Sequence, residues 1–254
     1  MSATDWPAPV SLINAGGTSD IVLICEHASN HMPKEYGRLG VSEADLQRHI
    51  AWDIGAAAVT RGLSQLLDAP AFLGTYSRLL VDLNRPFGVP SSMPVRSECT
   101  DIPGNAGLTD DERQRRRQII FEPFHAAVAM HLDERASSGK PTRLVTIHSF
   151  TPVFLGMPRP WHAGILYDRA EAFALRVIEG LSADRSLVIG RNVPYGIDRA
   201  EDYAVPIHGT DRGNPAILVE IRHDLIAVER GVAEWIQRLG EVLGHENKMD
   251  SRSN

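Results

Sequence analysis

The stretch IVLICEHASN, residues 21–30, joins a strand-like run to an abruptly polar end. Residues 21–25 are continuously apolar and rich in β-branched side chains, as expected for a strand that is covered on both faces in an α/β sheet. Turn-forming residues and Pro33 follow, so the chain should leave the sheet at this point. Glu26 and His27 are therefore predicted to stand together at the end of a buried strand.

Strand-like and helix-like segments alternate along the rest of the chain. The predicted strands are 71–85 (AFLGTYSRLLVDLNR), 144–148 (LVTIH), 163–168 (AGILYD), 187–191 (LVIGR) and 217–222 (ILVEIR). The predicted helices run from an N-cap at Ser42 to about 67, from a capping box at Thr109 and Glu112 to about 137, over 169–182, and through Val232, Ile236 and Leu239. Residues 86–108 are predicted to form a long loop, of a length that is usually functional or mobile. This alternation predicts a single α/β domain over residues 1–254, with a mostly parallel or mixed central sheet flanked by helices.

Composition narrows the class of protein. With 43% hydrophobic and 23% charged residues and a net charge of -6, the 254-residue chain is typical of a globular protein and has no basic face for nucleic acid. Cys25 and Cys99 are too few and too far apart for a disulfide framework or a thiolate zinc site. The N-terminal stretch lacks a signal-peptide pattern, and no run of about 18 apolar residues occurs. We therefore expect a cytoplasmic protein without membrane or nucleic-acid partners; the oligomeric state, including a homo-oligomer, stays open.

Two predicted strands end in histidine, at His27 and His148. Each histidine alone is compatible with a structural role, but on neighbouring strands of one sheet the two imidazoles can converge on a metal ion. Catalytic zinc usually has three protein ligands, often two histidines and a carboxylate. Asp53, in the segment RHIAWDIG of the first predicted helix, is the expected third ligand, and Glu26 is the alternative. The sequence therefore predicts a Zn²⁺ site at His27, Asp53 and His148.

The segment SRLLVDLNRPF concentrates groups that recognise carboxylates. Arg78, Asn84 and Arg85 would bring two guanidinium groups and an amide close to one strand end, a combination suited to binding a substrate carboxylate. In a strand, Asp82 and Asn84 would share a face. The alternative for Arg78 is an internal ion pair with Asp82, which is compatible with ligand binding by the other two residues.

Glu220 lies within the apolar segment ILVEIR. Burial there would raise the pKa of its carboxyl group toward the range that suits a general base. Arg222 falls on the same face of this strand, so it is a candidate for binding substrate. The alternative is a structural ion pair between Glu220 and Arg222.

Five motifs in order, EHASN, HIAWDIG, SRLLVDLNRP, TIHSF and VEIRHDL, resemble the N-formylglutamate amidohydrolase family over residues 20–240, nearly the whole chain. The resemblance implies a zinc-dependent hydrolase that converts N-formyl-L-glutamate to formate and L-glutamate, as in histidine degradation. DLNRPF is also similar to the Asn-Arg element of aspartoacylase and zinc carboxypeptidase relatives, which grips a substrate carboxylate. Those relatives imply a zinc carboxypeptidase-like fold and the role of general base for Glu220. Their His-x-x-Glu zinc motif is altered here, because Asn30 stands where the glutamate would be.

Three other functions remain as alternatives. The enzyme could act as a deacylase or peptidase on another small N-acyl substrate. The departure at Asn30 would also fit a non-catalytic carboxylate-binding protein that has lost its metal. A serine nucleophile is disfavoured, since no G-x-S-x-G segment is present and Ser149 instead follows a histidine.

Overall fold

Seven strands form the central sheet, in the spatial order β1–β3–β2–β6–β11–β9–β10. A computed structural model describes residues 6–250, with side chains up to residue 244; the two ends of the predicted domain, 1–5 and 251–254, lie outside the described residues. The strands are Val10–Ile13 (β1), Ile21–Cys25 (β2), Ala71–Gly74 (β3), Arg143–Phe150 (β6), Ala163–Leu166 (β9), Ile189–Arg191 (β10) and Ala216–Arg222 (β11). The pairs β3–β2, β2–β6, β6–β11 and β9–β10 are parallel, whereas β1–β3 and β11–β9 are antiparallel. The predicted α/β class with a mixed sheet is confirmed.

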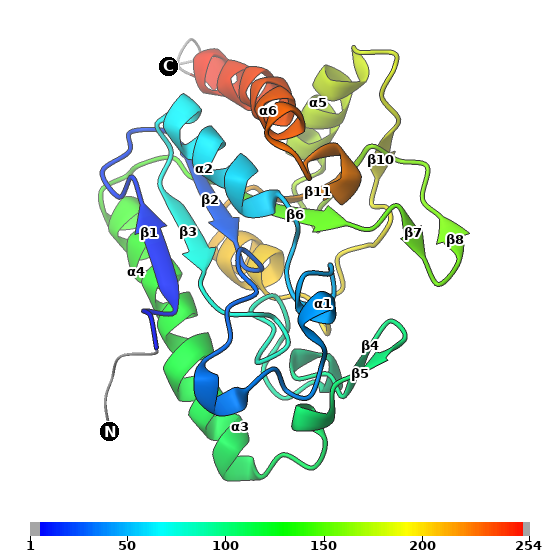
Figure 1. Cartoon of the computed structure of the whole chain (residues 1–254). Coiled ribbons are helices and arrows are strands. Elements are labelled where there is room, and N and C mark those ends of the chain that lie inside the picture. Colours follow the sequence, from blue (N-terminus) through cyan, green and yellow to red (C-terminus); the bar gives the residue numbers. More distant parts are fainter. Residues whose placement is uncertain (1–5, 251–254) are drawn as a thin grey trace.

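Helices cover both faces of this sheet (Figure 1). On one face, α2 (Ala56–Leu67), α5 (Glu171–Ser182) and α6 (Glu229–Asp250) share a hydrophobic core with the strands. On the other face lies α4 (Glu122–Ser137), which α3 (Asp110–Arg116) reaches through a π-helical turn. Both β2 and β6 are buried along their whole length. In β2 this burial explains the uniformly apolar sequence IVLIC, whereas β6 (RLVTIHSF) carries buried polar side chains among its apolar ones.

Short elements connect these layers. Two small hairpins are formed by β4 (Arg96–Ser97) with β5 (Thr100–Asp101) and by β7 (Val153–Phe154) with β8 (Met157–Pro158). The remaining segments are α1 (Glu43–Leu46), a π-helical segment at Ala204–Gly209 and 3-10 turns at Lys34–Tyr36, Pro90–Ser92, Pro103–Asn105, Thr210–Arg212 and His223–Leu225.

The first predicted helix is wrong as a continuous element. Ser42 does cap a helix, since its side chain accepts a hydrogen bond from the backbone of Asp45, but α1 ends at Leu46 and α2 begins only at Ala56. Gly55 adopts a positive φ of 82° between them, and a Cβ there would lie 2.2 Å from the backbone oxygen of Ile226. At Gly55 the chain therefore packs closely against a distant segment, and no local pattern reveals that contact.

The predicted strand over 71–85 is also too long. Beyond Gly74 the backbone bonds to loops instead of strands: the Ser77 amide donates to His31 O and the Arg78 amide donates to Ala51 O. The alternation argument for Asp82 and Asn84 therefore fails. By contrast, the cap at Thr109 is confirmed, because its side chain accepts a hydrogen bond from the backbone of Glu112.

The long loop 86–108 contains ordered structure that is anchored to the core. Asn105 is fully buried, and its amide donates to Leu79 O and Pro94 O at 2.8 and 2.9 Å. The guanidinium of Arg116 donates to the Asn105 side-chain oxygen at 2.7 Å. These contacts fix the base of the loop beside the segment that carries Asp82 and Arg85.

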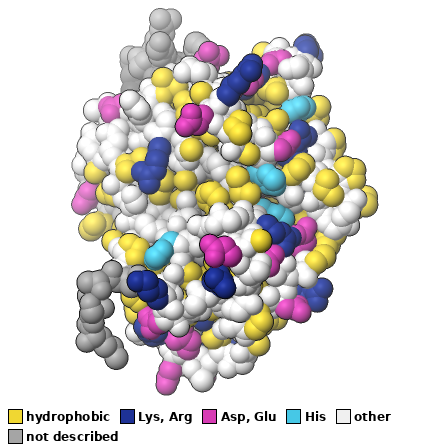
Figure 2. Space-filling view, viewed as in Figure 1, with side chains coloured by type: hydrophobic (Ala, Val, Ile, Leu, Met, Phe, Trp, Pro, Cys, Tyr) yellow, Lys and Arg dark blue, Asp and Glu magenta, His cyan; other side chains and the backbone are white. Residues whose placement is uncertain are grey.

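Charged side chains of both signs are interspersed over the face of the molecule shown in Figure 2. Within residues 6–250, no helix combines the length and the apolar composition that a bilayer-spanning segment needs. The longest helix, α6, has 22 residues, many of which are charged.

Gly74 offers a test of the packing beneath the polar end of β2. A Cβ at this position would lie 2.2 Å from the backbone oxygen of Glu26, so Gly74→Ala must push the two strand ends apart. We expect the free energy of unfolding in urea to fall by about 1–3 kcal/mol. The control is Gly16→Ala, where nothing lies within 4 Å of the new Cβ. Equal stability of the two variants would contradict the close approach.

Candidate active site

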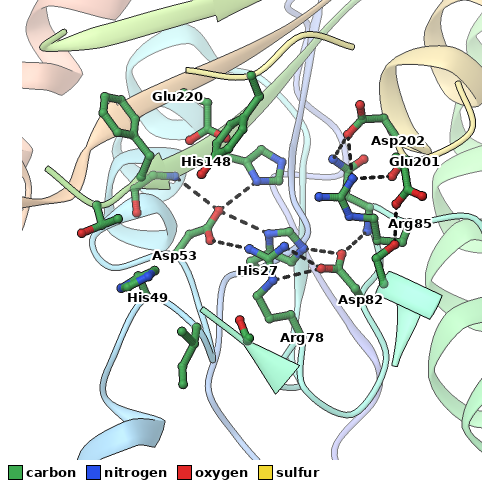
Figure 3. A pocket seen from close by; sticks show the side chains of 18 of the residues that line it. His27, His49, Asp53, Arg78, Asp82, Arg85, His148, Glu201, Asp202 and Glu220 are labelled. Carbon is green, nitrogen blue, oxygen red and sulfur yellow. Dashed lines mark hydrogen bonds and ion pairs between the residues drawn. The ribbon is translucent and has the colours of Figure 1, made fainter. Parts of the chain in front are cut away.

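A cavity of about 530 Å³ opens where the parallel strands β2, β6 and β11 end (Figure 3). Alternation of side chains along β11 explains part of its polar wall: Leu218 belongs to the core on the α4 side, and Glu220 continues that face two residues further along and lines the cavity. The strand register places Glu220 directly beside His148. The carboxyl edge of the sheet is where sites of open α/β proteins form.

Asp53 joins the two predicted histidine ligands in this cavity. Its Oδ2 lies 2.8 Å from His148 Nδ1 and 3.3 Å from His27 Nδ1, and all three side chains are buried. The Asp53 backbone amide also donates to His27 O at 2.9 Å, so the turn before α2 is tied to the end of β2. The structure thus brings the three predicted metal ligands together.

The second nitrogen of each imidazole faces another carboxylate. His27 Nε2 is 2.7 Å from Asp82 Oδ1, in a hydrogen bond. His148 Nε2 is 2.9 Å from Glu26 Oε2, an ion-pair contact whose angles are not those of a hydrogen bond. Metal-bound histidines commonly contact a carboxylate through the nitrogen that does not face the metal. Glu26, the alternative ligand, therefore faces the opposite side of His148 from Asp53.

Arg78 binds two of these carboxylates, those of Asp82 and Asp53. Its Nε and Nη2 donate to Asp82 Oδ2 at 2.9 and 2.6 Å, and its Nη1 lies 3.4 Å from Asp53 Oδ1. The internal ion pair that was the alternative reading of Arg78 is therefore present. Burial raises the pKa of Asp82, but Arg78 and His27 outweigh it and hold the pKa well below its usual value.

The pKa shifts of His148 and Asp53 reflect the pairing of imidazoles with carboxylates in this cluster. Burial lowers the pKa of His148, but Glu26 and Asp53 outweigh it and raise the pKa well above the usual value. Burial likewise opposes ionisation of Asp53, but His27 and His148 shift its pKa downward. The cluster therefore holds protons that a metal ion would replace on binding.

The donor set fits zinc. The ligand atoms of His27, Asp53 and His148 lie within 4.8 Å of one another, and two imidazole nitrogens with one carboxylate oxygen are common catalytic zinc ligands. Asn30 does not belong to this group, because its amide donates to Leu46 O at 2.8 Å. Asp53 places beside the two imidazoles a carboxylate that the altered His-x-x-Glu motif lacks.

Glu220 differs from the other carboxylates of the cavity. Burial is the main reason that its pKa rises to about 7, although His148 acts in the opposite direction. Its Oε2 is buried and has no hydrogen-bond partner among the described residues. Tyr195, which also lines the cavity, accepts a hydrogen bond from Arg159 at 2.8 Å. Glu220 can thus gain or lose a proton near neutral pH.

Asn84 and Arg85 also line the cavity, and both contact the segment 201–204. The Asn84 side-chain oxygen accepts hydrogen bonds from the amides of Tyr203 and Ala204 at 3.2 and 3.0 Å. Arg85 Nη1 donates to Glu201 O at 2.6 Å and lies 3.5 Å from Asp202 Oδ1. The predicted carboxylate-binding pair therefore faces the same cavity as Glu220.

Arg222 is not brought to this site. Its Nε donates to Asp224 Oδ1 at 2.8 Å, and it is absent from the described lining of the cavity. It forms no ion pair with Glu220 in the described contacts, since its partner is two residues further along the chain. The period-two argument placed Arg222 and Glu220 on one face, but Arg222 is the last residue of β11 and its side chain pairs with Asp224 instead of lining the cavity.

Sequence reasoning missed several residues of the cavity, among them Tyr195 and Asp202, and it did not identify Asp82 as the partner of His27. The position of Asp82 between Arg78 and Asn84 was a usable signal. Tyr195 and Asp202 lie in an irregular segment without periodicity, so only the fold shows where they are.

Buried histidines and carboxylates at the carboxyl ends of parallel strands define an α/β enzyme whose site lies at this edge of the sheet. The family model described as N-formylglutamate amidohydrolase matches residues 19–227. The chain therefore belongs to the N-formylglutamate amidohydrolase family, a family of hydrolases, as the resemblance of its motifs predicted. Among curated proteins, no relative matches the chain.

Solved structures share this fold. A gene product of Agrobacterium tumefaciens is 40% identical, with a TM-score of 0.92 over 98% of this chain and 97% of that one. N-formylglutamate amidohydrolase from Ralstonia eutropha JMP134 is 17% identical, with a TM-score of 0.71 over 98% of this chain and 100% of that one. The cell shape determinant Csd4 of Helicobacter pylori is 11% identical, with a TM-score of 0.50 over 94% of this chain and 56% of that one. The last two likenesses concern the fold alone.

Zinc binding can be tested on protein that has been treated with a chelator. One Zn²⁺ per chain should bind, and at about 100 times the Kd it should stabilise the folded state by about 2.7 kcal/mol, or roughly 5–10 °C in Tm. His148→Gln should lose this binding, because it removes a ligand. His49→Gln is the matched control, since His49 lines the same cavity but lies outside the cluster. Equal zinc binding by both variants would contradict the assigned ligands.

The raised pKa of Glu220 predicts a specific pH dependence of stability in metal-free protein. The folded state raises this pKa from 4.5 to about 7, so it favours the protonated carboxyl group. This contribution is fully present below about pH 4.5 and is lost as the pH rises through about 7. Glu220→Gln does not titrate, so its free energy of unfolding should increase relative to the wild type between pH 5 and pH 8. If urea unfolding gave the same free-energy difference between Glu220→Gln and the wild type at pH 5 and at pH 8, the raised pKa of Glu220 would be contradicted.

Proposed function

We propose that this protein is a zinc-dependent amidohydrolase of N-acyl amino acids, with N-formyl-L-glutamate as substrate and formate and L-glutamate as products. The observation that supports this most directly is the buried cluster of His27, Asp53 and His148 beside Glu220, whose pKa is about 7, in one cavity. Membership of the N-formylglutamate amidohydrolase family supports the substrate class.

The three ligands would hold the metal through His27 Nδ1, His148 Nδ1 and the Asp53 carboxylate. Bound zinc would lower the pKa of a water molecule and polarise the acyl carbonyl group. The carboxylates Asp82 and Glu26 contact the outward nitrogens of the two imidazoles and so fix the direction in which Nδ1 points. Arg78 holds Asp82 in place through its two short hydrogen bonds.

Glu220 would act as general base and then as general acid. Its ionised carboxylate takes a proton from the attacking water, whose oxygen forms a bond to the acyl carbon. The C–N bond then breaks, and Glu220 returns the proton to the departing amine nitrogen. A carboxyl group with a pKa of about 7 suits both steps, because neither protonation state is strongly disfavoured at neutral pH.

Asn84 and Arg85 would bind a substrate carboxylate and so orient the scissile bond. A guanidinium fork matches the geometry of a carboxylate, and fixed orientation removes part of the entropic barrier to reaction. The cavity of about 530 Å³ is also large enough for other small N-acyl amino acids, which stay as alternative substrates.

The same proposal assigns the protein to cytoplasmic amino-acid metabolism, of the kind that degrades histidine, with a small N-acyl amino acid as its partner. Cys25 and Cys99 are both free thiols, which fits a reducing compartment.

The experiment is to incubate zinc-loaded enzyme with N-formyl, N-acetyl and N-succinyl amino acids and to measure formate or free amino acid. We expect hydrolysis of N-formyl-L-glutamate, and a loss of kcat by a factor of about 10²–10⁴ in Glu220→Gln, which removes the base. The control Glu98→Gln changes another glutamate that lines the cavity, one that is paired with Arg48, and should keep most of the activity. No turnover of any substrate, together with retained binding, would instead support a carboxylate-binding protein.

A further inference from the structure

The two predicted carboxylate-binding side chains converge on a carboxylate of the protein itself. Asn84 Nδ2 donates to Asp202 Oδ1 at 3.4 Å, and Arg85 Nη1 lies 3.5 Å from the same oxygen atom. Figure 3 shows Asp202 beside Arg85 on the wall of the cavity. An amide and a guanidinium that share one carboxylate oxygen have the arrangement expected around a bound substrate carboxylate.

We propose that Asp202 is a specificity-determining residue, because its carboxylate occupies the Asn84–Arg85 clamp in the free enzyme and a substrate carboxylate takes its place there. This inference rests on the proposed function, in which Asn84 and Arg85 bind the carboxylate of the substrate. It adds that the clamp is already filled by an internal competitor.

The distances show which of the two cavity arginines can exchange its partner. Arg78 makes two hydrogen bonds to Asp82, at 2.9 and 2.6 Å, which are lengths typical of strong charge-assisted bonds. Arg85 and Asp202 are separated by 3.5 Å, and the Arg85 side chain is 29% exposed. Loose, partly solvated ion pairs contribute little to stability. Asp202 can therefore leave Arg85 at small cost, whereas Asp82 cannot leave Arg78.

Asp202 also has contacts outside the clamp, and these hold its carboxylate in place when a ligand replaces it at Asn84 and Arg85. Its Oδ2 accepts a hydrogen bond from the Asp198 amide at 2.8 Å, and its own amide donates to Asp198 O. Burial raises the pKa of Asp202, although Arg85 acts in the opposite direction, so the pairing does not fully offset the cost of burying the charge. The tight turn at 198–202 holds the carboxylate next to the clamp even when Oδ1 is displaced.

An internal competitor would favour ligands that are anchored at two points. A substrate whose acyl group is held near Glu220 presents its carboxylate to the clamp at a high effective concentration, so it can displace Asp202. After cleavage, the amino acid product loses its acyl anchor, and Asp202 competes with it more effectively. The expected results are weak binding of simple carboxylates and rapid release of the product.

The test measures the Kd of glutarate, a simple dicarboxylate, by calorimetry with zinc-loaded protein. Asp202→Asn should bind glutarate about three to ten times more tightly than the wild type, because the competing charge is gone. Asp198→Asn is the matched control: it removes one negative charge from the same turn, but its Oδ1 accepts a hydrogen bond from Ala200 N and does not contact the clamp. Its Kd should stay within about twofold of the wild type.

Several outcomes would overturn the proposal. Unchanged or weaker binding by Asp202→Asn would mean that Asp202 orients Arg85 instead of competing with ligand. An equal gain in glutarate affinity in Asp198→Asn would mean that the effect arises from the lower net negative charge of the turn and not from the contact between Asp202 and the clamp. In an Arg85→Gln background, Asp202→Asn should give no gain, since the shared partner is missing. If Asp202→Asn does not fold, Asp202→Ser provides the same comparison.

Kinetics separate this inference from the proposed function. For N-formyl-L-glutamate, Asp202→Asn should lower KM and strengthen product inhibition by L-glutamate, with kcat unchanged; a merely structural role would lower kcat or Tm instead. If no N-acyl amino acid is hydrolysed, the proposed function fails, but the glutarate titrations still decide whether Asp202 occupies the clamp.

Discussion

The carboxylate of Asp53 is the constraint on which the site depends. It is buried beneath the end of the sheet, where an unpaired charge would cost several kcal/mol, and it is stabilised by His27, just after β2, and by His148 in β6. Its backbone amide is bonded to His27 O, so the same residue fixes the turn before α2. Burial of one charge thus links β2, β6 and the helix that follows.

Two carboxylates of the same cavity, Asp82 and Glu220, have pKa values that are shifted in opposite directions because their neighbours differ. Asp82 contacts His27 and Arg78, so its pKa is depressed and it stays ionised. Glu220 is buried without a hydrogen-bond partner for Oε2, and its pKa rises to about 7. Environments that push pKa values apart in this way assign different roles to chemically similar groups. Asp82 is suited to holding a histidine, and Glu220 is suited to moving a proton.

Periodicity predicted those parts of the fold that are buried along their whole length. β2 is recognisable because a parallel strand covered on both faces has a continuously apolar sequence, and Leu144, Val145 and Ile147 mark β6. The cap at Thr109 marks the start of α3 correctly. The predicted helix over 42–67 is interrupted between Leu46 and Ala56, and the predicted strand over 71–85 ends at Gly74. At Gly55 and Gly74 a distant backbone segment lies so close that a Cβ would not fit, and local pattern carries no information about that segment.

The sequence by itself determined the α/β class, the family and the candidates His27, Asp53, His148 and Glu220, because residue type and position at strand ends already indicate this chemistry. Only the tertiary structure decided how they are used. It placed Asp53 Oδ2 between the two imidazoles, turned Arg222 away toward Asp224, and set Asp202 against Asn84 and Arg85 across more than a hundred residues of chain. Such contacts depend on the folding of distant segments onto one another, and charge pairing in a buried cavity then selects the partners.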